Sequence, residues 1–378
     1  MKIAILTLPL WNNYGGILQC LAMCKKLEEY GHEVILLNYH HKPVRRHVEY
    51  IRIIKRKIRK LITGSGCKVY PNRVQREIIS QNTLEFIKNN FSLISPEFHT
   101  SAELSKYLTD NLIETVVVGS DQVWRPSYTP NIYTYFLDFV PDDVIRIAYA
   151  PSFGTDKVLY SERMITECKK LIDRLDLVTV REISGKSLLK KMFNINADVV
   201  VDPTLLHKKD MYTDLVHDVP CQNKGDIFCY VLDRTEDISN QICNAEKGLG
   251  KKSFEIMPKT FDEKFNTSDI TYKFPPIESW VAAFRDSDYI ITDSFHGCVF
   301  SIIFNKPFVA IGNHERGMSR FESLLKQFGL EDRLVVSKTD SLSHVLTRSI
   351  NWTSVNAKRD ELCLNSLDLL LEGLKVER

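Results

Sequence analysis

Short apolar runs and longer amphipathic segments alternate along most of the chain. Residues 2–8 (KIAILTL) form a mostly apolar run, residues 17–31 carry apolar side chains at helical spacing, and residues 32–39 (HEVILLNY) are largely apolar again. A short apolar run is typical of a strand covered on both faces of a parallel sheet. Strand, helix and strand in this order predict a βαβ unit with a right-handed crossover.

The same alternation continues to the end of the chain. Further strands are predicted at 114–124, 145–154, 175–185, 197–206, 227–232, 253–258, 288–297 and 306–312. Helices are predicted at 76–91, 278–287 and 319–330, and the tail from about residue 340 is also predicted to be helical.

The polar segment 206–226 separates two such series and predicts a domain boundary. A chain of 378 residues is long enough for two α/β domains. We therefore expect an α/β protein with two doubly wound, Rossmann-like domains that face a cleft. The expected limits are 1–205 for the first domain, 206–340 for the second, and 341–378 for a helical tail that could cross back to the first.

Composition excludes several classes of protein. The net charge of +2 favours no nucleic-acid partner. The nine cysteines include no Cys-x-x-Cys pair, which predicts reduced, structural thiols. The sequence has no long apolar run and no cleavable signal peptide, so we expect a cytoplasmic protein. Metal-ligand spacings, dinucleotide and P-loop motifs and a serine-hydrolase elbow are missing, which predicts no metal and no bound cofactor.

A densely basic segment at 42–60 has apolar residues at helical spacing and precedes a Gly-Ser-Gly break at 64–66. It predicts a basic amphipathic helix or lid over 42–66. Two interpretations stay open. The segment is a solvated helix or lid, or it is attracted to an anionic surface at the inner membrane face, where a lipid-linked sugar would lie.

Polar residues follow most of the predicted strands. In open parallel sheets, ligands bind beyond the carboxyl ends of the strands. The residues at these ends are Asn13, Tyr14, Gly15, Gly16, Ser120, Asp121, Ser152, Arg181, Asp202 and His296. Because they recur at successive strand ends, we expect them to point into one cleft.

His296 is the strongest acid–base candidate. It lies in Ser294–Gly297 (SFHG), between an apolar strand and an apolar helix. An imidazole at a helix start is close to backbone N–H groups that favour an anion. The alternative is a histidine that only holds the loop by hydrogen bonds.

Arginines offer candidate anion contacts. Arg181 follows a long apolar run and is either a surface charge or a clamp for carboxylate or phosphate. His314, Arg316 and Arg320 form a basic, Gly-flanked loop that either closes on an anion or is a solvated turn.

Other candidates have equally plain alternatives. Asp121 is a base or acceptor contact, or else it caps the next segment. Trp11 and Trp124 could stack on a sugar, but core packing is the usual place of such residues. Asp202, which precedes Pro203, is expected to fix a domain junction rather than take part in chemistry.

Seven segments together resemble the polysaccharide pyruvyl transferase family. They are NNYGGILQCLAM, VVVGSDQVWRP, AYAPSFG, VTVREISG, VVVDPTLL, ITDSFHGCVFSIIFNKPFVAI and ERGMSRFESLL, in family order over residues 1 to about 330. The resemblance implies a two-domain GT-B-like fold and synthesis of capsule or exopolysaccharide. It also implies transfer of the enolpyruvyl group of phosphoenolpyruvate, as a ketal, to a lipid-linked or nucleotide-linked sugar.

The resemblance also assigns residues. The family histidine falls on His296, and Arg181 matches the arginine after its strand. Many relatives have arginine and leucine before the histidine, where this chain has Ser294 and Phe295. Arg316 or Arg320 is therefore expected to replace the missing cation.

Three sets of site residues are predicted on these grounds. The catalytic residues are His296 and Asp121. The donor site is expected to comprise Arg181, Ser294, Gly297, His314, Arg316 and Arg320. The acceptor site is expected to comprise Asn13, Tyr14, Gly15, Gly16, Ser120, Trp124 and Ser152.

Two other functions are compatible with the same patterns. One is a GT-B glycosyltransferase that uses a nucleotide sugar. The other is a non-catalytic protein of the same fold that acts at a membrane surface through residues 42–60.

Overall fold

The computed structural model describes residues 1–42, 70–220, 225–312, 317–336 and 341–376. The predicted basic segment lies outside the described residues except at its first position, and so do His314 and Arg316. The interpretations of that segment stay predictions.

The first half of the chain forms a seven-stranded parallel sheet in the order β3-β2-β1-β4-β5-β6-β7. Its strands are β1 (Lys2–Leu6), β2 (Glu33–Tyr39), β3 (Ile94–Phe98), β4 (Thr115–Val118), β5 (Ile145–Ala148), β6 (Leu177–Val180) and β7 (Asp198–Val199). Successive strands lie on one side of β1 up to β3 and on its other side from β4 onward, so the strand order reverses between β1 and β4. Ligands bind at such a switch point in open α/β sheets.

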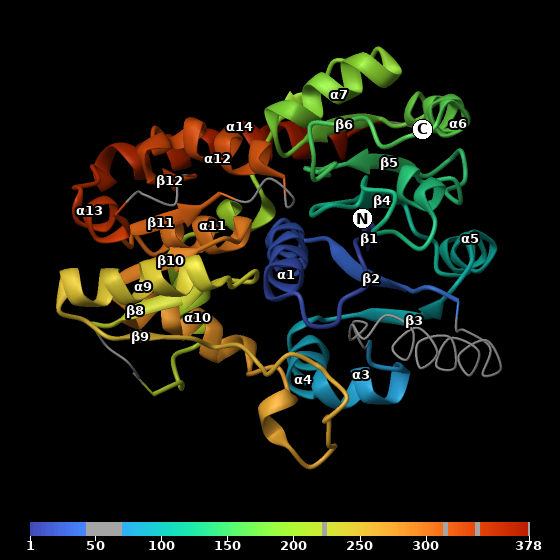
Figure 1. Cartoon of the computed structure of the whole chain (residues 1–378). Helices are drawn as coiled ribbons and strands as arrows, with labels where there is room; N and C mark the ends of the chain where they lie inside the picture. The colour runs from blue at the N-terminus through green and yellow to red at the C-terminus, as the bar shows by residue number, and fades with distance from the viewer. Residues whose placement is uncertain (43–69, 221–224, 313–316, 337–340, 377–378) are drawn as a thin grey trace.

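The second half forms a five-stranded parallel sheet in the order β12-β11-β10-β8-β9. Its strands are β8 (Ile227–Tyr230), β9 (Ser253–Phe254), β10 (Tyr289–Thr292), β11 (Phe308–Ile311) and β12 (Leu334–Val335). Figure 1 shows this sheet on the left, the first sheet on the right, and α1 near the middle.

Helices cover the two sheets. In the first half they are α1 (Tyr14–Glu29), α3 (Arg73–Ile79), α4 (Gln81–Asn90), α5 (Ser101–Asp110), α6 (Glu162–Ile172) and α7 (Ile183–Phe193). Later in the chain they are α8 (Lys209–Asp214), α9 (Glu236–Leu249), α10 (Ile277–Asp286), α11 (Phe295–Ile303), α12 (Met318–Phe328), α13 (Leu342–Thr347) and α14 (Trp352–Gly373).

Several predicted elements differ from the observed ones. The predicted helix 76–91 is two helices, because α3 ends at Ile79, the buried Ser80 follows as its C-cap, and α4 starts at Gln81. The polar segment 206–226 contains the short helix α8. The strand β3 was not predicted, since its sequence (ISPEF) has a proline and a glutamate and lies at the sheet edge.

The last helix lies against the first half of the chain. The Ser366 hydroxyl oxygen accepts a hydrogen bond from the backbone N–H of Val201 at 3.1 Å. The Cys363 thiol donates to the carbonyl of Leu205 at 2.8 Å. The predicted domain limits themselves stay a prediction.

Candidate active site

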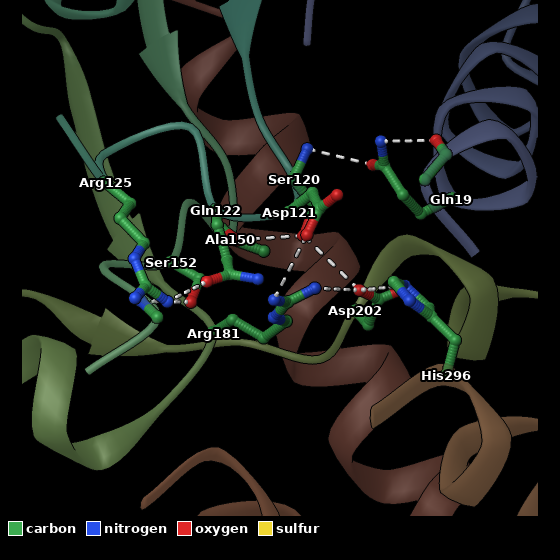
Figure 2. Close-up of polar contacts among 12 residues, drawn as sticks. Gln19, Ser120, Asp121, Gln122, Arg125, Ala150, Ser152, Arg181, Asp202 and His296 are labelled. Atoms are coloured by element: carbon green, nitrogen blue, oxygen red, sulfur yellow. Dashed lines mark hydrogen bonds and ion pairs between the residues drawn. The ribbon is translucent and has the colours of Figure 1, made fainter. Parts of the chain in front are cut away.

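Polar side chains from both sheets meet at the strand ends, as Figure 2 shows. Asp121 follows β4, Arg181 follows β6 and Asp202 follows β7. His296 is in the first turn of α11, after β10. All four side chains are almost fully buried, with between 1% and 6% of each residue exposed. Their meeting is a consequence of topology, because parallel strands bring their carboxyl ends to one edge.

Asp202 is the centre of this cluster. Its Oδ2 accepts a hydrogen bond from Arg181 Nη1 at 2.8 Å and lies 3.4 Å from both His296 Nε2 and the Ser120 hydroxyl. Its Oδ1 accepts from the backbone and hydroxyl of Thr204. Burial alone would raise the pKa of Asp202, but the neighbouring His296 and Arg181 hold that pKa well below its usual range. Asp202 is therefore a carboxylate at neutral pH.

Arg181 is a buried cation, and two of its guanidinium nitrogens make no hydrogen bond to the described residues. Burial disfavours its charge, but the carboxylates of Asp202, Glu182 and Asp121 outweigh burial and raise its pKa. Its guanidinium carbon lies 4.2 Å from the centre of the Phe295 ring. Its Nη2 lies 3.8 Å from Asp121 Oδ1 and its Nε lies 3.8 Å from Glu182 Oε2, but neither nitrogen has a hydrogen-bond partner among the described residues.

The first turns of α11 and α1 hold His296 in place. The Ser294 side chain accepts from the backbone N–H of Gly297 at 3.4 Å and so caps the helix that carries His296. The imidazole lies directly against Gly15 in the first turn of α1, where a Cβ atom would overlap the ring. Gly15 is thus required for close approach of the two helices.

The start of α1 is tied to the turn after β4. Asn13 caps α1 by accepting from the backbone N–H of Gly16, and its side-chain amide donates to Asp121 Oδ2 at 3.0 Å. Gln19, one turn later, accepts from the backbone N–H of Ser120 at 2.9 Å. These bonds fix Asp121 relative to the helix that packs on the histidine.

Arg320, on α12, is a second buried cation close to the cluster. Burial and the nearby charge of Arg181 together lower the pKa of Arg320 to about 10, so it remains protonated at neutral pH. Glu182 accepts from the Ser152 hydroxyl at 2.8 Å and from the backbone N–H of Phe153 at 3.2 Å. Its other carboxylate oxygen, Oε2, lies 3.8 Å from Arg181 Nε and has no hydrogen-bond partner in the described part of the chain.

Two predicted acceptor residues lie in the interior. Trp124 is fully buried, its indole N–H donates to the carbonyl of Tyr135, and its ring stacks on Phe136. Tyr14 is 1% exposed, and its hydroxyl donates to the carbonyl of Pro275 at 2.7 Å. The predicted acceptor contacts of these two residues stay predictions.

Three further residues support the site from within. Ser120 and Ser152 are fully buried and bond inside the cluster. A Cβ on Gly297 would overlap the side chain of Thr292, so this glycine allows helix α11 to pack on the strand before it. Their predicted contacts with substrates stay predictions.

Sequence reasoning missed the importance of Asp202 and Glu182. Asp202 was interpreted as a junction residue, yet it is the one that joins Arg181 to His296. The signal was available, because Asp202 follows an apolar strand just as Asp121 does. Glu182 gave no signal, since a charged residue after a strand is usually solvated.

The described residues bear on two other predictions. They contain no group of three or more His, Cys, Asp or Glu side chains that could hold a metal ion. No helix in the described part of the chain is long and apolar enough to span a membrane. The expected absence of a cofactor and the expected cytoplasmic location both stay predictions.

Two parallel sheets with charged strand ends between them are the architecture of a GT-B-like α/β fold. The family model for polysaccharide pyruvyl transferase matches residues 13–315. The chain therefore belongs to the polysaccharide pyruvyl transferase family and is a transferase of polysaccharide biosynthesis. No curated protein sequence is significantly similar to it.

Solved structures confirm the predicted fold class. The UDP-GlcNAc 2-epimerase of Methanocaldococcus jannaschii, in complex with UDP-GlcNAc and UDP, has a TM-score of 0.53 and 14% identity, over 97% of this chain and 99% of that one. A putative UDP-N-acetylglucosamine 2-epimerase from Listeria monocytogenes has a TM-score of 0.50 and 8% identity, over 96% and 91% of the two chains. At these identities the likeness shows the fold alone.

Proposed function

We propose that this transferase moves the enolpyruvyl group of phosphoenolpyruvate to a sugar, forms a pyruvate ketal and releases phosphate. One observation carries the proposal. Among the described residues, Arg181 Nε and Nη2 and His296 Nε2 are buried at the strand ends without hydrogen-bond partners, and each lies between 3.4 and 3.8 Å from a carboxylate oxygen. Buried polar atoms are normally satisfied, so such a group is expected to be completed by the polar atoms of a ligand.

The charges suit this donor. Phosphoenolpyruvate carries a phosphate and a carboxylate, both of which pair well with guanidinium groups. Arg181 and Arg320 are the two buried arginines at the cluster. Ser294 stands where many relatives have an arginine, and we propose that Arg320 supplies the replacement charge. In this scheme the two arginines bind the donor, and the reaction uses no metal or other cofactor.

His296 is the proposed general acid. It gives a proton to the methylene carbon of the donor, and the electrons of the carbon–carbon double bond form the new C–H bond. A sugar hydroxyl adds to the central carbon and loses its own proton. The C–O bond to phosphate then breaks, and a second hydroxyl of the same sugar adds to that carbon, gives its proton to the departing phosphate and so closes the ketal. A histidine suits this transfer because it exchanges protons near neutral pH.

Two carboxylates have separate roles in this scheme. Asp202 lies 3.4 Å from His296 Nε2 and stabilises the protonated imidazole. Asp121, which is oriented by Asn13, is the proposed acceptor of the proton that the sugar hydroxyl loses. Asp202 is thus a positioning residue, and Asp121 and His296 are the proposed catalytic residues.

Thermal unfolding with and without ligands tests the donor. A ligand that binds only the folded protein stabilises it by RT ln(1 + [L]/Kd), which is about 2.7 kcal/mol at a hundredfold excess over Kd. We expect phosphoenolpyruvate to raise Tm by a few degrees, and Arg181→Gln to abolish that shift. Stabilisation by UDP- or GDP-sugars alone would instead indicate a glycosyltransferase. Stabilisation by neither would indicate a non-catalytic protein.

A further inference from the structure

Helix α12, from the second half of the chain, contacts the start of helix α7, from the first half. The Ser323 hydroxyl oxygen accepts a hydrogen bond from the backbone N–H of Ile183, the first residue of α7, at 3.0 Å. The Ser184 hydroxyl donates to that of Ser319, one turn earlier on α12, at 3.2 Å. Figure 1 shows one end of α12, in orange, near the start of α7, in green. We call the contact of these four residues the α7–α12 joint.

Ser323 supplies a cap that α7 does not obtain from its own N-cap residue. The first N–H groups of a helix have no partner within the helix, and the N-cap side chain usually accepts from one of them. Glu182 is the N-cap of α7, but its side chain makes no cap bond to that helix and accepts instead from Ser152 and Phe153. The hydroxyl that bonds to Ile183 comes from a residue 140 positions later. The turn that carries Glu182 is therefore held from the other half of the chain.

The same helix brings Arg320 to the charged cluster. Arg320 lies one turn before Ser323 on α12, and side chains at this spacing share a helix face. Both residues are buried. After burial, the charges of Arg181 and Glu182 have the largest effects on the pKa of Arg320, so its guanidinium is close to the turn that precedes α7. One face of α12 thus both holds that turn and adds a cation beside it.

A close backbone approach fixes the start of α12 as well. Gly317, directly before α12, has a φ of +84°, in the region that favours glycine. A Cβ at this position would lie 2.3 Å from the carbonyl oxygen of Gly154, in the turn after β5. The start of α12 therefore lies directly on the first half of the chain, and Ser323 makes a second attachment further along the helix.

We propose that Ser323 is a positioning residue for the donor, because its bond to Ile183 fixes Arg181 relative to Arg320. The inference rests on the proposed function for the statement that the ligand bound by these two arginines is phosphoenolpyruvate. His296 is held separately, by the first turns of α1 and α11. Loss of the Ser323 hydroxyl is therefore expected to weaken donor binding more than it slows the chemical step.

The test measures the Kd of phosphoenolpyruvate by calorimetry on the full chain, and kcat at saturating donor by phosphate release. Ser323→Ala removes the hydroxyl, and Ser323→Thr keeps one. The matched control is Ser161→Ala. Ser161 also caps a helix, since it accepts from the backbone N–H of Met164 at 3.3 Å, but it does so at the start of its own helix, α6.

Ser323→Ala should raise the donor Kd about five- to tenfold, the loss typical of one hydrogen bond, and Ser323→Thr should stay within about twofold of wild type. The value of kcat in Ser323→Ala should change less than about threefold. Ser161→Ala should lower the midpoint of urea unfolding and leave the donor Kd unchanged. The role of Ser323 is refuted by a wild-type Kd in Ser323→Ala, by an equal rise in Ser161→Ala, or by a Ser323→Thr variant that binds as weakly as Ser323→Ala.

A second measurement needs no donor. Ser184→Cys combined with Ser319→Cys places two thiols where the hydroxyls lie 3.2 Å apart. In a glutathione buffer the pair should form a disulfide, detected by mass spectrometry of the linked peptides. Adding Ser323→Ala should lower the equilibrium constant for this disulfide about five- to tenfold, because the same hydrogen bond holds the joint together.

The two measurements separate the inference from the proposed function. If phosphoenolpyruvate does not bind the wild-type chain while the disulfide still depends on Ser323, the proposed donor is wrong and Ser323 remains the residue that fixes the joint. An unchanged disulfide equilibrium in the Ser323→Ala background would refute the role of Ser323, whatever the donor is.

Discussion

At the residue scale, Asp202 connects Arg181 with His296. One oxygen of its carboxylate faces both Arg181 and His296, and the residue is 1% exposed. A buried charge that loses its partner is strongly unfavourable, because neither water nor another ion replaces it. This carboxylate is therefore expected to matter for both stability and turnover.

Asp202→Asn tests this expectation. We expect a loss of about 3 kcal/mol in the free energy of unfolding at pH 7 and a large fall in kcat. Since the pKa of Asp202 is lowered by folding, its contribution is present at neutral pH and is lost as the pH falls below about 4. Urea unfolding followed from about pH 4 down to about pH 2 should show a smaller acid dependence in the variant. Asp143→Asn, an exposed control, should match wild type.

His40 gives a second prediction at this scale. Burial lowers the pKa of His40 to about 4, so it is neutral in the folded protein, while the unfolded chain takes up a proton below about pH 6.5. Stability should therefore fall between pH 6.5 and pH 4. With allowance for partial exposure, the loss from pH 7 to pH 5 is about 1 kcal/mol.

His40→Gln should remove that part of the pH dependence in urea unfolding. The exposed His217→Asn should leave it unchanged. An equally steep fall in the His40→Gln variant would show that another group is responsible.

At the element scale, the first turn of α1 supports the site because it has no side chain at the point where His296 packs against it. Gly15 leaves room for the imidazole of His296, and a methyl group there would overlap the ring. Gly15→Ala should lower turnover at least tenfold and cost about 1–3 kcal/mol of stability, the usual range for overpacking. Steady-state kinetics and urea unfolding measure the two effects.

Gly185→Ala is the matched control, since it also places a methyl group in the first half of a helix. There the nearest atom to the added Cβ is 3.4 Å away, which is an ordinary contact. The control should keep wild-type turnover. Wild-type turnover in Gly15→Ala would show that contact with α1 does not position His296.

Apolar runs predicted the interior strands well, because a strand covered on both faces needs apolar side chains throughout. The edge strand β3 and the break at Ser80 carried no such signal. Trp124 shows a second limit. Its sequence left sugar stacking and core packing both open, and in the structure its ring packs against Phe136 and Phe153.

At the whole-molecule scale, the cluster joins the two sheets. His296 comes from the second and Asp202 from the turn after the last strand of the first. The sequence predicted that strand ends would meet, because parallel topology requires it. It could not predict which side chains would pair, since 94 residues separate these two partners and their contact depends on how the sheets pack.

The most direct test of the account is mass spectrometry of sugars incubated with the enzyme and phosphoenolpyruvate. A panel of hexoses linked to nucleotide or lipid diphosphates serves as acceptors. We predict that one of them gains pyruvate with loss of water, with one phosphate released per product. His296→Gln should form the product about 10²–10⁴ times more slowly. A panel without any such product, or wild-type turnover in His296→Gln, would contradict the account.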